Sequence, residues 1–238
     1  MCGRYASTRS PDELTLAFDA LDDTTGKAPP PDYNVAPTKP VYAVRADGSS
    51  RRLDVVSWGL VPSWARDRRI AGRLLNARAE TLDEKPAFRA AFARRRCLVP
   101  ADGWYEWTPR RDGPGKQPYF MTPVDGSVLA FAGLWETWGS GDDRVVTCTV
   151  VTTASHGALA DVHDRMPLVL PPDRWAAWLG EGPQCPPAEL LAPTPVGVVG
   201  AIEVRPVGPR IGNVRNNGPD LVTARYDCGD VASTTTLS

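Results

Sequence analysis

The chain begins Met1-Cys2-Gly3-Arg4, and Cys2 is the residue whose position suggests the most specific chemistry. Because the second residue is small, we expect removal of the initiator methionine, which leaves cysteine first. Its free α-amine, with an ordinary pKa of about 7.7–8.0, can condense with an aldehyde to an imine, on which the thiol closes a five-membered thiazolidine ring. Arg4 could lower the thiol pKa or hold a phosphate. Considered alone, Cys2 is still better explained as an incidental cysteine at a frayed terminus.

A second candidate is the segment Asn76-Ala77-Arg78-Ala79-Glu80-Thr81. If it is extended, successive side chains point to opposite faces, so Asn76, Arg78 and Glu80 share one face and the alanines share the other. A polar face backed by small residues fits the wall of a ligand site. It fits an edge strand with a solvated face equally well.

Glu106 lies within the aromatic tract Trp104-Tyr105-Glu106-Trp107. Aromatic neighbours are expected to desolvate the carboxyl and raise its pKa, which suits proton transfer. The aromatic rings could also stack nucleobases. A hydrophobic strand with Glu106 in a structural hydrogen bond explains the tract equally well.

His163 is one of only two histidines in the chain, and Asp161 and Asp164 flank it. Carboxylates can fix the tautomer of an imidazole ring, which favours an acid–base role. A lone histidine is more often structural, but this polar cluster directly precedes an apolar strand, and that favours a functional site.

Positive charge is concentrated in one part of the chain. Residues 66–96 hold ten Lys or Arg against four Asp or Glu, although the whole chain has a formal net charge of -1. A basic segment on an otherwise acidic body indicates a localised anion-binding face, for which nucleic acid is the obvious partner. For Arg94-Arg95-Arg96 alone, a solvated helix face is at least as good an explanation.

The composition excludes several classes of protein. A 238-residue chain with 42% hydrophobic and 23% charged residues is neither intrinsically disordered nor histone-like. No apolar run approaches the roughly 20 residues of a membrane span, and the N-terminus lacks a signal sequence, so we expect a cytoplasmic protein. Five scattered cysteines without a C-x-x-C spacing indicate reduced thiols. We expect no metal and no cofactor.

Three helices are expected. Ser10-Pro11-Asp12-Glu13 has the pattern of a capping box that starts the first helix. Its apolar face would be formed by Leu14, Ala17, Phe18 and Leu21. Residues 85–96 and 172–179 predict two more helices, the latter ended by Gly180.

Strand-like runs lie at residues 41–45, 53–61, 128–138, 145–153 and 196–207, and residues 109–117 suggest a mobile hairpin tip. Strands outnumber helices and do not alternate regularly with them. This predicts an α+β fold: a single domain with a curled, mostly antiparallel, barrel-like β-sheet core flanked by short helices. We expect the domain to span residues 1–226 and residues 227–238 to form a disordered tail.

Together the motifs resemble the SOS response-associated peptidase (SRAP) family, which shields abasic sites in single-stranded DNA. The resemblance runs nearly end to end and rests on seven tracts in the family's order: Met1-Cys2-Gly3-Arg4, Tyr33-Asn34-Val35-Ala36-Pro37, Trp58-Gly59-Leu60-Val61-Pro62 with Trp64, Asn76-Ala77-Arg78-Ala79-Glu80-Thr81, Ala101-Asp102-Gly103-Trp104-Tyr105-Glu106-Trp107, His163-Asp164-Arg165-Met166-Pro167 and Gly212-Asn213-Val214-Arg215-Asn216. The sequence departs from the family at residues 109–117, beyond residue 221, and at Ala65, where some members carry a second tryptophan.

The resemblance implies roles for these residues. Cys2 would form the thiazolidine crosslink to C1′ of the opened abasic sugar. Glu106 would assist imine formation, His163 would act as acid–base in ring opening and reversal, and Asn76 would orient the sugar. DNA contacts are implied for Arg4 and Arg78 as phosphate clamps, Trp64 and Trp107 as base-stacking surfaces, and Thr152 as a backbone contact. Some lyase activity and a peptidase step that removes Met1 are implied as well.

Two other functions are consistent with the residues alone. A cysteine peptidase or amidohydrolase would use Cys2 as nucleophile, His163 as base and Asn76 as orienting group. A non-enzymatic binder of single-stranded DNA would need only arginine and tryptophan side chains. The resemblance favours abasic single-stranded DNA as the partner of a monomer that binds neither membrane nor metal.

Overall fold

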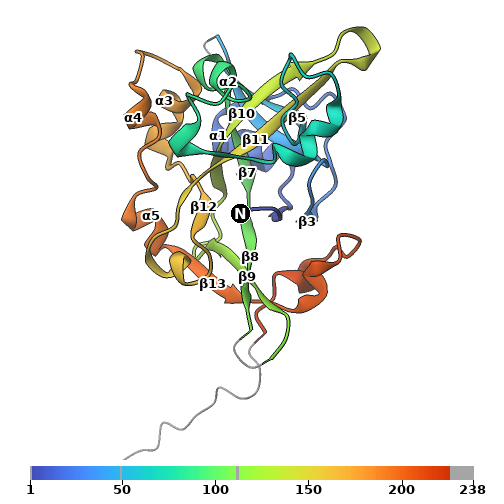
Figure 1. Cartoon of the computed structure of the whole chain (residues 1–238), viewed down its shortest axis with the longest axis vertical. Helices are drawn as coiled ribbons and strands as arrows, with labels where there is room; N and C mark the ends of the chain where they lie inside the picture. The colour runs from blue at the N-terminus through green and yellow to red at the C-terminus, as the bar shows by residue number, and fades with distance from the viewer. Residues whose placement is uncertain (1, 49, 111–112, 226–238) are drawn as a thin grey trace, which may run out of the picture.

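The computed structural model describes residues 2–48, 50–110 and 113–225. It shows one domain of mixed α+β structure, in which short helices surround two β-sheets (Figure 1). Most neighbouring strands run antiparallel, and this confirms the predicted fold class. The predicted boundary between residues 226 and 227 lies outside the described residues, as do residues 111 and 112 of the predicted hairpin tip.

The strands fall into a larger and a smaller sheet. The larger has the order β12-β11-β10-β7-β4-β5-β2, with β6 paired to β11. Its strands are β2 (Ala20–Asp22), β4 (Pro40–Asp47), β5 (Ser50–Trp58), β6 (Asn76–Arg78), β7 (Arg96–Ala101), β10 (Leu129–Trp138), β11 (Val145–Ala154) and β12 (Arg165–Pro167). The smaller has the order β13-β9-β8-β1-β3. Its strands are β1 (Tyr5–Ser7), β3 (Asp32–Val35), β8 (Gly103–Pro109), β9 (Lys116–Pro123) and β13 (Ile202–Pro206).

The helices are short. They are α1 (Pro11–Phe18), α2 (Arg89–Arg94), α3 (Trp175–Leu179), α4 (Pro187–Leu190) and α5 (Val196–Gly200). The capping box predicted for α1 is present, because Ser10 and Glu13 each bond the other's backbone N–H, and Leu14 and Phe18 are buried. The helix is shorter than predicted: Asp19 adopts a left-handed conformation at φ 49°, so Leu21 lies in β2 and is exposed.

Two other element predictions were partly wrong. The helix expected over residues 85–96 is confined to α2, because Arg96 already pairs with Leu134 of β10. The strand expected over residues 196–207 begins only at Ile202. Before it, the carbonyl of Pro195 accepts the N–H groups of Val198 and Val199, which closes the helical turn of α5. Burial of Val199 overrides the strand preference of valine here.

Apolar side chains cover both faces of the larger sheet. The face carrying Val151 of β11 packs against α1, α2 and α3. The opposite face, which carries Cys148 and Val150, packs against Trp104 of the smaller sheet. We call this second group the inter-sheet cluster; it contains Cys2, which is completely buried. Cys2 therefore lies inside the molecule, packed between the two sheets.

None of the helices in the described part of the chain has the length and apolar character that crossing a bilayer requires. This bears on those helices alone.

Gly103 at the start of β8 yields a test of how tightly β8 packs against the neighbouring strand β9. A Cβ there would lie 2.6 and 2.8 Å from ring atoms of Phe120, and closer still to the carbonyl oxygen of Met121. Gly103→Ala is therefore expected to lower the free energy of unfolding by about 1–3 kcal/mol through overpacking. Urea denaturation measures the change.

Gly197 in α5 is the matched control, because a Cβ there would meet nothing within 4 Å. Gly197→Ala should leave the free energy of unfolding unchanged or raise it by roughly 0.5–1 kcal/mol. Equal effects of the two substitutions would contradict the close packing inferred at Gly103.

Candidate active site

Asn76 joins the start of the chain to the larger sheet. Its Nδ2 donates a 2.7 Å hydrogen bond to the carbonyl oxygen of Cys2. β6 runs parallel to β11, with Asn76 beside Val150 and Arg78 beside Thr152. Val150 belongs to the inter-sheet cluster with Cys2, and Ala77 to the opposite face, so the predicted alternation of this strand is correct up to Arg78.

Glu106 reaches the same place from β8 of the smaller sheet. It is 4% exposed. Burial raises the pKa of its carboxyl. The desolvation predicted from the aromatic tract is therefore present. Strand alternation places Trp104 on the side of Glu106, and Tyr105 and Trp107 on the other.

The thiol of Cys2 is protonated at neutral pH. Complete burial raises its pKa far above the ordinary value of 9.0, and the negative charge of Glu106 raises it further. Among the described residues, no group of three His, Cys, Asp or Glu side chains could hold a metal ion, so none of them forms a metal site with this thiol.

His163 lies in the loop before β12, with a side chain 27% exposed. Its Nδ1 is 2.9 Å from the backbone nitrogen of Arg165 and 2.8 Å from Oδ1 of Asp164. These contacts exclude each other, because Nδ1 must offer a lone pair to the N–H but a proton to the carboxylate. The Asp164 side chain is 85% exposed, so in the neutral ring we assign Nδ1 to the Arg165 N–H and the proton to Nε2.

The four predicted catalytic residues, Cys2, Asn76, Glu106 and His163, are thus close together in the structure, although they come from four separate parts of the sequence. The exposed fraction falls from His163 to Glu106 and then to Cys2. A substrate would therefore reach Cys2 from the side on which His163 lies.

The residues predicted to contact DNA differ in how far they are exposed to solvent. Arg78 is exposed beside the site, and Thr152 is completely buried under it. Trp64 is 61% exposed. It lies at an open hollow of about 510 Å³ that is lined also by Arg66, Arg69 and Arg73. Trp107 is half-buried on the face of β8 opposite Glu106, where it packs with Tyr105.

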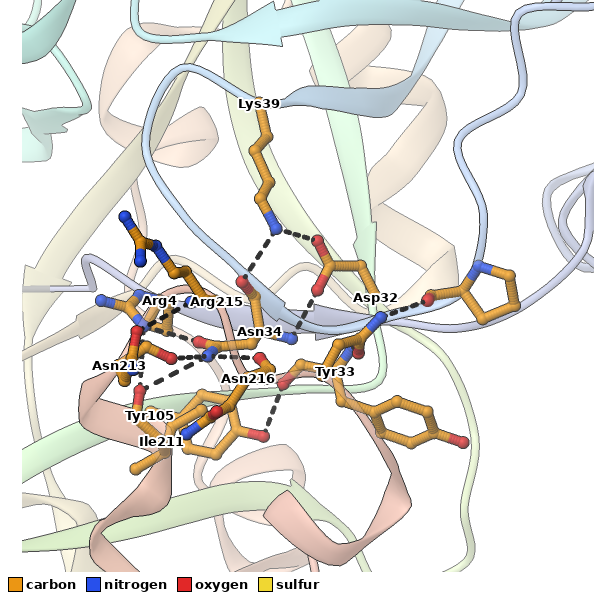
Figure 2. A network of polar contacts seen from close by, with 12 residues as sticks. Arg4, Asp32, Tyr33, Asn34, Lys39, Tyr105, Ile211, Asn213, Arg215 and Asn216 are labelled. Atoms are coloured by element: carbon orange, nitrogen blue, oxygen red, sulfur yellow. Dashed lines mark hydrogen bonds and ion pairs between the residues drawn. The ribbon is translucent and has the colours of Figure 1, made fainter.

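Arg4 takes part in a network of partly buried hydrogen bonds (Figure 2). Its Nη1 donates to Oδ1 of Asn34 at 2.6 Å and to the carbonyl of Ile211 at 3.0 Å, and burial lowers its pKa. Asn34 is completely buried, and its Nδ2 donates to the carbonyls of Asn213 and Asn216 at 3.0 and 2.9 Å. The network joins Arg4, directly before β1, to Ile211, 207 residues later.

Comparison with known proteins gives the family. The family model described as SOS response associated peptidase (SRAP) matches residues 1–214. The chain belongs to this family. The resemblance expected from the seven sequence tracts is confirmed.

Curated relatives align with nearly the whole of this SRAP chain. Abasic site processing protein YoaM of Bacillus subtilis is 37% identical over 228 residues, which cover 94% of this chain and 98% of YoaM. Abasic site processing protein YedK of Escherichia coli is 32% identical over 225 residues, covering 93% of this chain and 99% of YedK. HMCES of Xenopus tropicalis, named in the same way, is 31% identical and covers 94% of this chain and 78% of its own.

Solved structures share the SRAP fold seen here. A protein from Bacteroides thetaiotaomicron superposes with a TM-score of 0.81 at 24% identity, covering 94% of this chain and all of that chain. At this identity the likeness concerns the fold alone.

Sequence reasoning missed two polar residues of this SRAP chain, the buried Asn34 and the partly buried Arg165. Asn34 lies in one family tract and Arg165 in another, but neither was given a role. The Arg165 side chain is 12% exposed and bonds both carboxylate oxygens of Glu80. Membership in a motif was the available signal for both residues.

Glu106 gives a pH-dependent test of the site's electrostatics. A carboxyl whose pKa is raised on folding from 4.5 destabilises the folded state once the pH exceeds that value, because its charge is solvated only in the unfolded chain. Glu106→Gln should therefore have a higher free energy of unfolding than the wild type at pH 8, with the difference vanishing as the pH falls to about 4.5. Thermal denaturation across this range measures it.

Glu203 is a control of opposite sign. Hydrogen bonds from Arg205 lower its pKa, so its charge favours folding above the ordinary pKa. Glu203→Gln should lower the stability at pH 8 slightly or leave it unchanged. A loss of stability in Glu106→Gln at pH 8 would show that the buried charge is compensated in the folded state.

Proposed function

We propose that this SRAP protein, acting as a monomer, captures abasic sites in single-stranded DNA as a covalent thiazolidine crosslink to Cys2. The observation that carries the proposal is the 2.7 Å hydrogen bond from Asn76 to the carbonyl of Cys2, formed between the sheets close to Glu106. It supports a site built around the start of the chain. The names of the relatives, abasic site processing proteins, support the substrate.

The chemistry requires removal of Met1, because an acylated nitrogen does not condense with an aldehyde. The freed amine of Cys2 adds to the aldehyde at C1′ of the ring-opened sugar, and loss of water gives an imine. The thiol adds across the C=N bond, with sulfur joined to carbon and its proton passed to nitrogen. No oxidant or reductant is needed. A thiol whose pKa is raised by burial supplies the proton that ring closure consumes.

The neighbours of Cys2 suit the separate steps. Glu106, with its raised pKa, keeps a proton closer to neutral pH than an ordinary carboxyl, so it can donate to the departing water. His163, at the exposed side, exchanges protons with the sugar oxygen during ring opening. Asn76 holds Cys2 through Nδ2, whereas its buried Oδ1 has no hydrogen-bond partner within the described part of the chain. This oxygen can accept a hydroxyl of the opened sugar.

We assign the DNA strand to the side from which His163 is reached. Arg78 is exposed there as a phosphate clamp, and Trp64 can stack on a base beside three arginines. Arg4 lies in a partly buried polar network, Trp107 packs half-buried against an apolar cluster, and Thr152 is fully buried. This supports indirect roles for them, in shaping the site rather than contacting the strand.

Two further reactions follow from the same intermediate and from the chain start. The imine acidifies the protons at C2′, so loss of one of them with departure of the 3′-phosphate gives strand cleavage as a side reaction. Removal of Met1 is the peptidase step implied by the family name, and Glu106 is a candidate to assist it.

A cysteine hydrolase is less well supported. It would use Cys2, His163 and Asn76 but would give no role to the buried carboxyl of Glu106 or to the exposed Arg78 beside the site.

Crosslinking is tested with a single-stranded oligonucleotide carrying one abasic site. The mature protein should give an adduct that survives denaturing gel electrophoresis, and Cys2→Ala should give none. Cys2→Ser should give no stable adduct either, because a hydroxyl forms a much less stable ring. Intact-protein mass spectrometry measures loss of Met1 and the mass of the adduct.

Two controls isolate the chemistry. A tetrahydrofuran abasic analogue lacks the aldehyde and should bind without crosslinking. A tag placed before Cys2 should abolish the adduct and preserve DNA binding. The proposal fails if mature protein with a free Cys2 amine forms no adduct.

A further inference from the structure

We propose that the ion pair between Glu80 and Arg165 is a positioning device for His163: it holds the segment before β12 so that the backbone N–H of Arg165 bonds Nδ1 and proton transfer takes place at Nε2. The inference rests on the proposed function, since it concerns how that site orients its acid–base group. Neither Glu80 nor Arg165 has a role in the crosslinking chemistry described above.

The pair is well defined. Nη1 of Arg165 lies 2.5 Å from Oε1 of Glu80, and Nη2 lies 3.0 Å from Oε2. Nη2 also donates to the carbonyl of Thr152 at 2.6 Å. Two parallel bonds from one guanidinium to one carboxylate fix orientation as well as distance. Hydrogen bonds from Arg165 lower the pKa of Glu80, so the carboxylate is charged at neutral pH.

These bonds link three elements around the site. Glu80 lies in the 3₁₀ helix Ala79–Thr81 that follows β6, Thr152 in β11, and Arg165 at the start of β12. The prediction that Glu80 extends the polar face of a strand was therefore wrong: the chain turns after Arg78, and this turn brings the carboxylate to Arg165.

His163 is held from both sides of the loop. Its backbone N–H bonds the carbonyl of Leu159 at 3.2 Å, and the carbonyl of the next residue, Asp164, accepts the N–H of Ser155 at 2.9 Å. Arg165 completes the restraint through its own N–H to Nδ1 at 2.9 Å. The Arg165 backbone pairs with Ala154 of β11, and the side-chain bonds to Glu80 and Thr152 anchor the same residue on its other side.

Asp164 provides the competing arrangement. Its carboxylate lies 2.8 Å from the same Nδ1, on an exposed side chain. If the restraint on Arg165 is lost, Asp164 can take Nδ1 as a donor, which places the proton of the neutral ring on the wrong nitrogen. The ion pair therefore selects one tautomer of His163.

A double-mutant cycle on adduct formation tests whether Glu80 acts through His163. At saturating abasic single-stranded DNA, Glu80→Ala should lower the rate constant of adduct formation about tenfold. This is less than the roughly 100-fold or more that a well-placed acid–base group contributes, because His163 itself remains. The same substitution should have no effect in a His163→Ala background. Binding of the tetrahydrofuran analogue should be unchanged or slightly tighter, because removal of a carboxylate reduces repulsion of DNA.

Nitrogen NMR of the imidazole gives a readout that general damage to the fold would not move. The chain has two histidines, so the spectrum is simple to assign, with His163→Ala as reference. Wild-type His163 should be the Nε2–H tautomer, and Glu80→Ala should shift it towards Nδ1–H. Glu80→Gln, which keeps an acceptor for Arg165, should lie between the two.

Glu203→Ala is the matched control. It also removes a carboxylate paired with an arginine, Arg205, but this pair lies in β13 of the smaller sheet. It should change neither the rate constant nor the tautomer. The inference is overturned if Glu80→Ala leaves the rate constant unchanged, raises it by freeing Arg165 for DNA, or lowers it equally with and without His163. A wild-type protein that forms no adduct would refute the proposed function, and the tautomer measurement would still test the positioning itself.

Discussion

Burial of the first residues between the two sheets is the constraint on which the site depends. Chain termini are usually poorly ordered, but here β1 pairs with both β3 and β8. Tyr5 is fully buried, and its ring makes edge contacts with Trp58 and Phe131 at centroid distances of 5.2 and 6.1 Å. Cys2, three residues earlier, is therefore placed by core packing, so its reactive atoms have a fixed relation to Asn76.

Placing polar groups in a core has an energetic cost. The charge of Glu106 is desolvated, and the Oδ1 atom of Asn76 is buried with no hydrogen-bond partner among the described residues. An unsatisfied buried polar atom costs about 1–3 kcal/mol. Sites that act on a ligand commonly retain such costs, because the ligand completes the bonds that the fold leaves open. The pattern agrees with a site reserved for a sugar.

The sequence predicted what depends on neighbours along the chain. Strand alternation correctly placed Asn76 and Arg78 on one face, and the aromatic tract correctly indicated desolvation of Glu106. Contacts between distant segments could not be predicted in this way. Glu80 and Arg165 are 85 residues apart in the sequence, and burial of Val199 converts an apparent strand into a helical turn. Family tracts pointed to Asn34 and Arg165 without revealing their partners.

The network around Asn34 has a consequence for how the protein is made. Arg4 bonds the carbonyl of Ile211, 207 residues later. At a synthesis rate of roughly 5–20 residues per second, some 10–40 s separate the emergence of the two from the ribosome. The guanidinium of Arg4 therefore stays without this partner until nearly the whole chain has been made. Because translation runs from the N-terminus, closure of the network around Asn34 is one of the last steps of folding.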